Sequence, residues 1–365
     1  MAPASPGLWV RSIGRGDVRV HHLTALPVGD QSPADLAQRA ARALLGRRAS
    51  VAWLLAFGPA QAREEVLAAL AAAIGPIAFP ITWVTAPSCN GGSLAGVQLT
   101  AVSGTTLRTL TAGGAVAGTV FEDEHATWCH LGGVGPGRVD TAREQQARQT
   151  YANARALLRQ AGMDLGDLAR TWLYNDAITS WYAPFNAVRA EQYQAAGVLD
   201  RLIPASTGIG APNPSGSALT LSALAVRPRG AGVSLQAVPS PLQGPAADYG
   251  SFFSRAIEIA SPGARTLLIS GTAAIDAAGK TLCPGDVGGQ IRCTLEVVAA
   301  LLASRGMTWH DVTRAIGYFN RASDAGAFEP CAGQAHLPPL PLLLTQCDIC
   351  RDDLLFELEL DAISR

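Results

Sequence analysis

Two stretches of the chain decide the fold: QARQTYANARALLRQAGMDLGDLARTWLY, Gln146–Tyr174, and QIRCTLEVVAALLASRGMTWHDVTRAIGY, Gln290–Tyr318. They align without a gap at a spacing of 144 residues. Each has apolar residues at helical spacing, then a glycine that ends the helix, a short turn with an aspartate, and a strand. A repeat of this length indicates a duplicated domain and not a solenoid, so we expect two similar α+β units in one chain.

Strand signals surround both helices. They are Val116–Val134, Ala169–Asn175 and Leu219–Val226 around the first, and Arg265–Ile275, Thr313–Phe319 and Leu340–Ala362 around the second. The segment Arg227–Ala246 is rich in proline and glycine and marks the junction between the units. We therefore predict one unit at residues 106–230, a similar one at 236–365, and an N-terminal α/β extension at 1–105. The extension contains a predicted helix at Gln61–Ile74, and none of its residues indicates a particular chemistry.

Composition excludes several classes of protein. The 365 residues are 48% hydrophobic and 16% charged, which favours a large core over disorder. A net charge of -1 gives no overall attraction to nucleic acid or to an anionic membrane. Val66–Asn90 carries no charge, but Gly75, Pro76 and Pro80 interrupt it, so we do not expect it to span a membrane.

The chain has seven cysteines, an odd number, and no secretory signal, so we expect reduced thiols in the cytoplasm. Cys347 and Cys350 have the spacing of a redox pair or of half a zinc site. We expect them in a strand, where residues three apart point to opposite faces. Because no second pair of this spacing exists, we predict neither metal nor redox use.

The last predicted strand carries three carboxylates on one face. Alternation over Leu354–Ala362 places leucine and phenylalanine side chains on one side and Glu357, Glu359 and Asp361 on the other. Three neighbouring carboxylates repel one another, so this face requires water, a partner or a pocket lined with donors. Periodicity alone favours a face in contact with solvent.

Two further segments have a functional and a structural interpretation. Pro204–Gly216, PASTGIGAPNPSG, could bind an anion through its backbone N–H groups or be a plain loop. Trp172–Tyr193 mixes aromatic residues with Asn186 and Arg189, as in an apolar pocket with a few oriented polar groups. A helix with an aromatic core stripe explains the second pattern slightly better.

Three motifs together resemble a known superfamily. The segment LLISGTAAID at 267–276, the repeated helix-turn-strand, and CRDDLLFELELDA at 350–362 are similar to the reactive intermediate deaminase (Rid) superfamily. Two such units with an N-terminal extension resemble the chorismatases over roughly residues 110–365. The resemblance implies two tandem Rid-like, chorismate-mutase-like domains and a homotrimer.

In chorismatases, chorismate is cleaved to pyruvate and a hydroxybenzoate or a dihydroxycyclohexadiene carboxylate, in secondary metabolism. The resemblance makes Glu357 the general acid that protonates the enolpyruvyl methylene. A carboxylic acid held neutral near like charges suits this step, because carbon must be protonated. Cys350 occupies a position where cysteine accompanies 3-hydroxybenzoate formation, which we favour. Ala273 lies near the other position that separates product types.

Further substrate-binding candidates come from the same resemblance and from the charge of chorismate, a dianion. They are Cys350, Arg351, Gly271, Thr272, Ala273, Tyr174, Asn186, Arg189, Ser206, Thr207, Tyr249 and Arg255. Arg255 could instead form a core salt bridge. Single-domain deaminases carry a carboxylate-binding arginine where this chain has Leu344, which argues against simple imine hydrolysis.

The prediction is thus a cytoplasmic, cofactor-free hydrolase or lyase with chorismate as its small-molecule partner. The alternatives are a Rid-type enamine or imine deaminase and a non-catalytic Rid-like ligand-binding protein.

Overall fold

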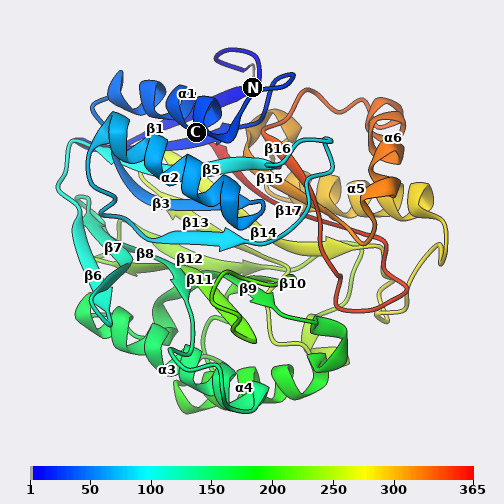
Figure 1. Ribbon diagram of the computed structural model, residues 1–365. Helices are drawn as coiled ribbons and strands as arrows, with labels where there is room; N and C mark the ends of the chain where they lie inside the picture. Colours follow the sequence, from blue (N-terminus) through cyan, green and yellow to red (C-terminus); the bar gives the residue numbers. More distant parts are fainter. Residues whose placement is uncertain (1–2) are drawn as a thin grey trace.

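The computed structural model describes residues 3–365, which form three mixed sheets with the helices on their outer faces (Figure 1). The N-terminal sheet has the strand order β1-β2-β5-β3-β4. Its elements are β1 (Leu8–Arg15), β2 (Val18–Ala25), α1 (Pro33–Leu45), β3 (Ser50–Phe57), α2 (Ala60–Ile74), β4 (Ile81–Val84) and β5 (Gly96–Ser103).

The second sheet has the order β6-β7-β8-β11-β9-β10, and the third β12-β13-β14-β17-β15-β16. The second unit contains β6 (Arg108–Ala112), β7 (Ala115–Glu122), β8 (Ala126–Val134), α3 (Arg143–Gln160), β9 (Leu168–Asn175), α4 (Tyr182–Ala195), β10 (Ala205–Gly210) and β11 (Leu219–Pro228). The third contains β12 (Ser234–Val238), β13 (Ala256–Ser261), β14 (Ala264–Ala273), α5 (Val287–Ala303), β15 (Val312–Phe319), α6 (Phe328–Gln334), β16 (Leu342–Gln346) and β17 (Phe356–Ser364). The two units have the same topology, and the predicted α+β fold with two similar units is confirmed.

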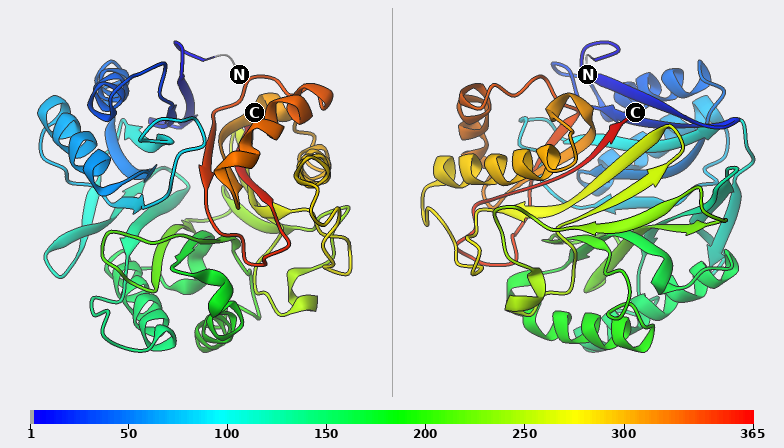
Figure 2. Two further views of the ribbon diagram at one scale, coloured as in Figure 1. Left: turned by 45° about the vertical axis from the view of Figure 1, so that its right-hand side comes forward. Right: turned by 180° about the vertical axis from the view of Figure 1, so that it is seen from behind.

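The N-terminal residues, predicted as an extension, repeat this topology a third time. Their order β1-β2-β5-β3-β4 corresponds to β7-β8-β11-β9-β10 of the second unit, without its first strand. The three pairs of helices lie at three corners around the sheets (Figure 2). The chain therefore contains three units of one topology.

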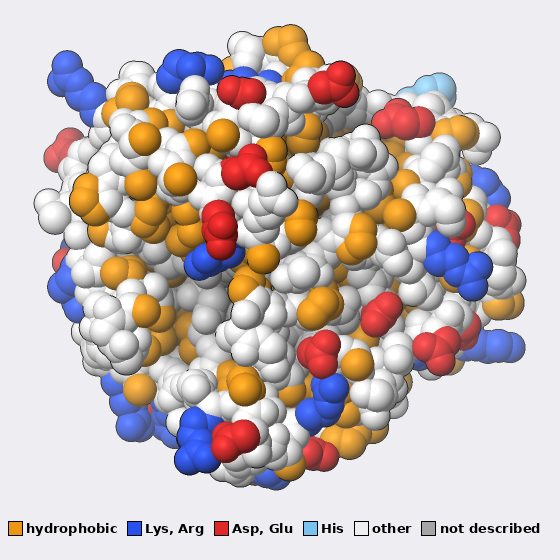
Figure 3. Space-filling view, in the orientation of Figure 1, with side chains coloured by type: hydrophobic (Ala, Val, Ile, Leu, Met, Phe, Trp, Pro, Cys, Tyr) orange, Lys and Arg blue, Asp and Glu red, His pale blue; other side chains and the backbone are white. Residues whose placement is uncertain are grey.

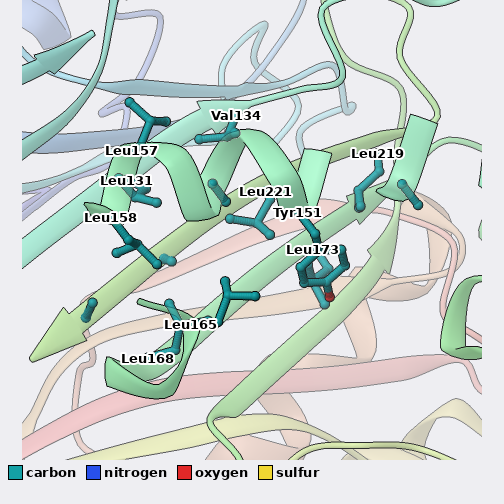
Figure 4. Packing of buried hydrophobic residues seen from close by; sticks show 14 of the residues in the cluster. Leu131, Val134, Tyr151, Leu157, Leu158, Leu165, Leu168, Leu173, Leu219 and Leu221 are labelled. Atoms are coloured by element: carbon teal, nitrogen blue, oxygen red, sulfur yellow. The ribbon is translucent and has the colours of Figure 1, made fainter. Parts of the chain in front are cut away.

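Each helix pair packs on its own sheet. In the second unit, Leu157 and Leu158 of α3 are buried with Leu173 and Leu221 of the strands (Figure 4). In the third unit, Phe356, Leu358 and Leu360 of β17 share a core with α5, as the alternation predicted. Burial of one leucine side chain contributes about 2 kcal/mol, so these faces hold each helix to its sheet.

The three units meet around an approximate threefold axis. Phe57, Tyr174 and Tyr318 occupy equivalent positions at the ends of β3, β9 and β15, and they share one buried cluster. The Phe57 ring lies 5.9 Å from that of Tyr174 and 6.1 Å from that of Tyr318, both edge-on. These side chains join units that are far apart in the sequence.

Several local predictions are wrong. The carboxylates of β17 do not face solvent: Glu357, Glu359 and Asp361 are 5%, 0% and 6% exposed. The plain-loop interpretation of Pro204–Gly216 is wrong for Ala205–Gly210, which is a strand that pairs parallel to β9. Leu340–Ala362 contains two strands, and the Cys347–Cys350 motif lies in the irregular segment between them.

The surface has no obvious charge segregation on the face in Figure 3, where basic and acidic side chains are interspersed. This pattern agrees with the net charge of -1. No helix within residues 3–365 is both long enough and apolar enough to cross a membrane.

Candidate active site

A pocket of about 230 Å³ lies where β10 of the second unit meets β14 of the third. The second unit contributes one wall from β10 and α4, and the third unit contributes β14, the start of β17 and the segment before it. The lining residues are Tyr182, Arg189, Ser206, Gly208, Tyr249, Ser251, Phe253, Arg255, Gly271, Ala273, Ile275, Cys350, Arg351, Leu354 and Glu357.

The pocket brings together most of the predicted site residues. Glu357, Cys350, Arg351, Gly271, Ala273, Arg189, Ser206, Tyr249 and Arg255 all line it. Asn186 and Thr207 lie behind the wall, where they bind Arg189 and Arg170 respectively. Thr272 is buried and donates to the Ser270 carbonyl. Tyr174 lies outside the pocket, because alternation along β9 turns its ring toward the axis.

Glu357 is the buried acid of this pocket. Burial, and after it the negative charge of Glu359, raise the pKa of Glu357 from the usual 4.5 to about 8, while nearby arginines act in the opposite direction. Gly271 on the adjacent strand leaves room for the carboxyl, since a side-chain carbon at that position would collide with the Glu357 Oε1 atom. Glu357 is therefore protonated at neutral pH and can donate a proton.

Glu359 differs because it is fully paired. Its carboxylate accepts from the Arg170 guanidinium at 2.7 Å, from that of Arg314 at 2.5 Å and from the Trp172 indole at 2.9 Å. These partners hold the pKa of Glu359 below its usual value although the side chain is wholly buried. The negative charge of Glu359 in turn raises the pKa of Glu357, two residues away on the same strand. Asp361 is instead paired with Arg314 at 3.2 Å.

Three arginines surround the pocket without carboxylate partners. Arg189 is 2% exposed, and its Nη2 donates to Asn186 Oδ1 at 2.5 Å. Arg255 donates to the Gly244 carbonyl at 2.8 and 3.0 Å, and Arg351 donates to the Gly279 carbonyl at 2.8 Å. No acidic residue within 3–365 forms a salt bridge with any of the three, so Arg255 does not form the alternative core salt bridge. Their charge suits a ligand with carboxylates.

Comparison with known proteins identifies similar sequences. The chain is 30% identical to a chorismatase of Streptomyces hygroscopicus over 232 residues, 57% of this chain and 64% of that protein. It is 30% identical over 215 residues to a chorismatase of Streptomyces rapamycinicus, 53% of this chain and 63% of that protein. Thus the match spans less than two thirds of either relative.

The three-sheet fold has a match among solved structures. A crystal structure of a chorismatase superposes with a TM-score of 0.65 at 23% identity, covering 86% of this chain and 93% of that one. The chain is similar to chorismatases in part of its sequence and in its fold. A 3-hydroxybenzoate synthase of Streptomyces hygroscopicus is 27% identical over 253 residues, 61% of this chain and 71% of that protein. No family model matches the sequence.

Cys350 and Ala273 are the two residues expected to influence which product forms. Both line the pocket, Cys350 next to Glu357 and Ala273 at the end of β14. Burial, and then the Glu357 carboxylate, raise the pKa of Cys350 to about 12, so the thiol is neutral. The Ala273 carbonyl accepts from Gln243 Nε2 at 2.9 Å, which fixes this part of the wall.

Sequence analysis missed several pocket residues. Tyr182 lies within the aromatic stretch Trp172–Tyr193, whose pocket interpretation was not preferred. Ser251 and Phe253 belong to the long connection between β12 and β13, where the second unit has only a tight turn between β6 and β7. Proline and glycine in this connection indicated a junction, and nothing in the composition indicated a pocket wall.

Only one of the three interfaces carries the acid. Glu357 lies opposite Tyr318 in the third sheet, while the equivalent positions opposite Tyr174 and Phe57 hold Thr220 and Gly96. The related interfaces therefore lack a carboxyl at this position. Within residues 3–365 no cluster of histidine, cysteine, aspartate and glutamate has the arrangement of a metal site.

Proposed function

We propose that the protein is a chorismatase-type enzyme that cleaves chorismate to pyruvate and a cyclic carboxylic acid. The observation that carries the proposal is the buried Glu357 carboxyl, whose pKa is raised to about 8, in a pocket with three arginines that form no salt bridge with the described residues. The relatives named chorismatase support the same substrate.

In this proposal Glu357 donates its proton to the methylene carbon of the enolpyruvyl group. The carbon–carbon double bond gives up its electron pair to form the new C–H bond, and the positive charge develops on the ether carbon and oxygen. For 3-hydroxybenzoate, the oxygen of the neighbouring ring hydroxyl bonds to the ring carbon that carries the ether. The bond from that carbon to the ether oxygen then breaks and releases pyruvate, the hydroxyl proton returns to the Glu357 carboxylate, and the ring rearranges to the phenol. For the dihydroxycyclohexadiene carboxylate, water instead adds to the ether carbon, and the resulting hemiketal breaks down to pyruvate and the ring alcohol. Arg189, Arg255 and Arg351 hold the two substrate carboxylates, with Ser206 and Tyr249 as neutral donors.

We favour 3-hydroxybenzoate over a dihydroxycyclohexadiene carboxylate as the second product. The relative named 3-hydroxybenzoate synthase and the position of Cys350 beside Glu357 support this choice. Formation of 3-hydroxybenzoate and pyruvate from chorismate consumes no net water, whereas the cyclohexadiene product requires one. A cytoplasmic location and independence from metal and organic cofactors are part of the proposal.

The test is incubation of the purified protein with chorismate, with pyruvate followed by coupling to lactate dehydrogenase and the second product identified by chromatography. The Glu357→Gln variant keeps the shape of the side chain and removes the acidic proton. We expect pyruvate from the wild type and a loss of the order of 10²- to 10⁴-fold in the variant, with an unchanged circular dichroism spectrum. Absence of pyruvate with the wild type, or full activity of the variant, would overturn the proposal.

We further propose that one chain supplies the ring of three units that a homotrimer would otherwise provide. The shared strand order and the equivalent rings of Phe57, Tyr174 and Tyr318 support this assignment. Light scattering should then give the mass of one chain, 37.8 kDa. A mass three times larger would instead support the homotrimer.

A further inference from the structure

Two cysteine thiols lie in contact beside the start of α5, outside the pocket of the candidate active site. The Sγ atoms of Cys283 and Cys293 are 4.0 Å apart, and both side chains are partly exposed. Cys283 lies in the loop between β14 and α5, and Cys293 lies on the second turn of α5. The sulfur atoms of a disulfide are about 2.05 Å apart, so this pair bonds after an approach of about 2 Å.

The surface of α5 accommodates this pair through a glycine. Gly289 lies one turn before Cys293, and a side-chain carbon at Gly289 would lie 2.8 Å from the Cys283 Cβ atom. In the repeated helix of the second unit the equivalent residue is Gln145, and neither cysteine is repeated there. The fold therefore does not require a glycine at this position, which indicates that Gly289 makes room for Cys283.

The backbone of Cys283 is fixed against the helix. Its φ angle of 49° lies in the left-handed region, which a residue other than glycine adopts at a cost in free energy. The Cys283 carbonyl accepts from the Asp286 N–H at 3.1 Å and from Gln290 Nε2 at 3.4 Å. These contacts keep the Cys283 thiol beside Cys293, so the two thiols have a high effective concentration toward each other.

Cys283 directly follows a hairpin, residues 275–282, that forms part of the active-site pocket. A bridge and a backbone hydrogen bond close this hairpin. At its tip the Gly279 carbonyl accepts from Arg351 at 2.8 Å, and a side-chain carbon at Gly279 would lie 2.9 Å from the Tyr249 ring. Arg351, Tyr249 and the first residue of the hairpin all line the pocket. The position of Cys283 thus affects the wall of the pocket.

We propose that Cys283 and Cys293 form a reversible disulfide that controls substrate binding. With oxidised glutathione as the oxidant, the Cys283 thiolate attacks one glutathione sulfur, forms a mixed disulfide and releases one glutathione. The Cys293 thiolate then attacks the Cys283 sulfur and releases the second. The protons of the two protein thiols pass to the departing glutathione thiolates, so two protein thiols are oxidised and one glutathione disulfide is reduced.

The order of the two attacks follows from the environment of Cys293. Burial, and then contact with Cys283, raise the pKa of the Cys293 thiol. Because the thiolate is the nucleophile, we assign the first attack to Cys283.

Oxidation acts on the pocket through the hairpin. The apolar face of α5 is held in the core of the third unit, so the approach of the sulfur atoms draws the base of the hairpin toward α5. The Gly279 carbonyl moves with it, and Arg351 loses its orientation toward the substrate. We expect KM for chorismate to rise about tenfold, the lower end for a lost hydrogen bond to a charged group. This consequence rests on the proposed function, whereas disulfide formation does not.

The first test detects the disulfide without any substrate. The full-length protein is incubated in oxidised glutathione, its remaining thiols are blocked, and it is digested with trypsin without reductant. Cleavage after Lys280, Arg292 and Arg305 separates the two cysteines, so the peptides 281–292 and 293–305 stay joined only by a disulfide. Dithiothreitol should separate them. Unlinked peptides from the oxidised wild type would overturn the proposal.

Matched variants identify the pair. Cys283→Ser and Cys293→Ser should each abolish the linked peptides. Cys331→Ser is the control: this third cysteine lies beside α5, where its Sγ atom is 3.9 Å from Arg292 Nη1, and its removal should leave the linked peptides. Loss of the linked peptides in the control would contradict the assignment of the pair.

The second test measures the hairpin and the pocket separately. Lys280 is the only lysine in the sequence and is exposed in the hairpin, so endoproteinase Lys-C cuts the folded protein there. Oxidation should slow this cut and raise KM for chorismate in the wild type, and should change neither in Cys283→Ser. An oxidised wild type with an unchanged KM would overturn the control of binding. Absence of pyruvate from both redox forms would instead refute the proposed function and leave the linked peptides and the Lys-C rate as evidence for the disulfide.

Discussion

Glu357 and Glu359 lie two residues apart on the same face of β17, and their environments shift their pKa values in opposite directions. Glu359 is ionised between two arginines. Glu357 has no such partner within hydrogen-bond distance, and it is exposed to the negative charge of Glu359. One strand thus presents a permanent anion and a neutral acid to adjacent sites, which is the arrangement that general acid catalysis at neutral pH requires.

The first prediction concerns pH. Because only protonated Glu357 can donate, kcat/KM for pyruvate release should fall as pH rises through about 8.

The raised pKa of Glu357 also affects the stability of the fold. The folded protein retains this proton between pH 4.5 and about 8 while the unfolded chain loses it, so the free energy of unfolding should decrease over that interval. Denaturant titrations of the wild type and Glu357→Gln should differ in this slope; parallel curves would contradict the assignment.

The second prediction concerns the pairing of Glu359. Glu359→Gln removes the negative charge that raises the pKa of Glu357, so the alkaline limb of the kcat/KM profile should move to lower pH. It should also destabilise the fold by about 3–5 kcal/mol, because Arg170 and Arg314 lose a buried counter-charge. Asp361→Asn is the control: it also removes a partner of Arg314 but leaves the alkaline limb in place. A shifted limb in the control would refute the role given to Glu359.

The third prediction concerns the space beside the acid. Gly271→Ala should displace the Glu357 carboxyl and lower kcat by at least about tenfold, because misplacing a catalytic group by about 1 Å can cost on the order of 10²-fold. Gly208→Ala introduces the same methyl group into the same pocket, with no atom within 4 Å of the new carbon. The two variants should therefore differ in kcat, and equal activities would show that contact with Gly271 does not position Glu357.

The fourth prediction concerns substrate binding. Arg189→Gln should raise KM for chorismate about 10- to 100-fold, which corresponds to the roughly 1.5–3 kcal/mol of a hydrogen bond to a charged group. Arg148→Gln is the matched control on the neighbouring helix, where the guanidinium pairs with Glu191 at the surface. Steady-state kinetics should separate the two variants. A KM for Arg189→Gln like that of the control would mean that this arginine does not bind the substrate.

The repeat made most of the second and third units predictable. Residues that recur at one spacing, such as Gly162 and Gly306, mark the same helix end in both, and both adopt positive φ angles there. The first unit could not be recognised because its strands retain the topology without the repeated residues. Topology depends on which faces are buried, and many sequences satisfy that requirement.

The candidate site was only partly predictable. The alternation of β17 placed three carboxylates on one face, but periodicity cannot distinguish solvent from the face of another unit. Glu357 is buried where β10 packs against β14, the strand beside β17, and β10 is about 150 residues away in the sequence. Tyr182 and Phe253 reach the pocket for the same reason, through packing between units.

Covalent linkage of the three units has a consequence for how the protein can change. In an assembly of identical subunits every substitution appears at all three interfaces at once, so a costly buried acid would be present in triplicate. Here Glu357, Thr220 and Gly96 are encoded separately. One interface can therefore carry a reactive buried acid that destabilises the fold, while the other two are selected only for stability. A substitution at one of those two interfaces can add a function without loss of the function of Glu357.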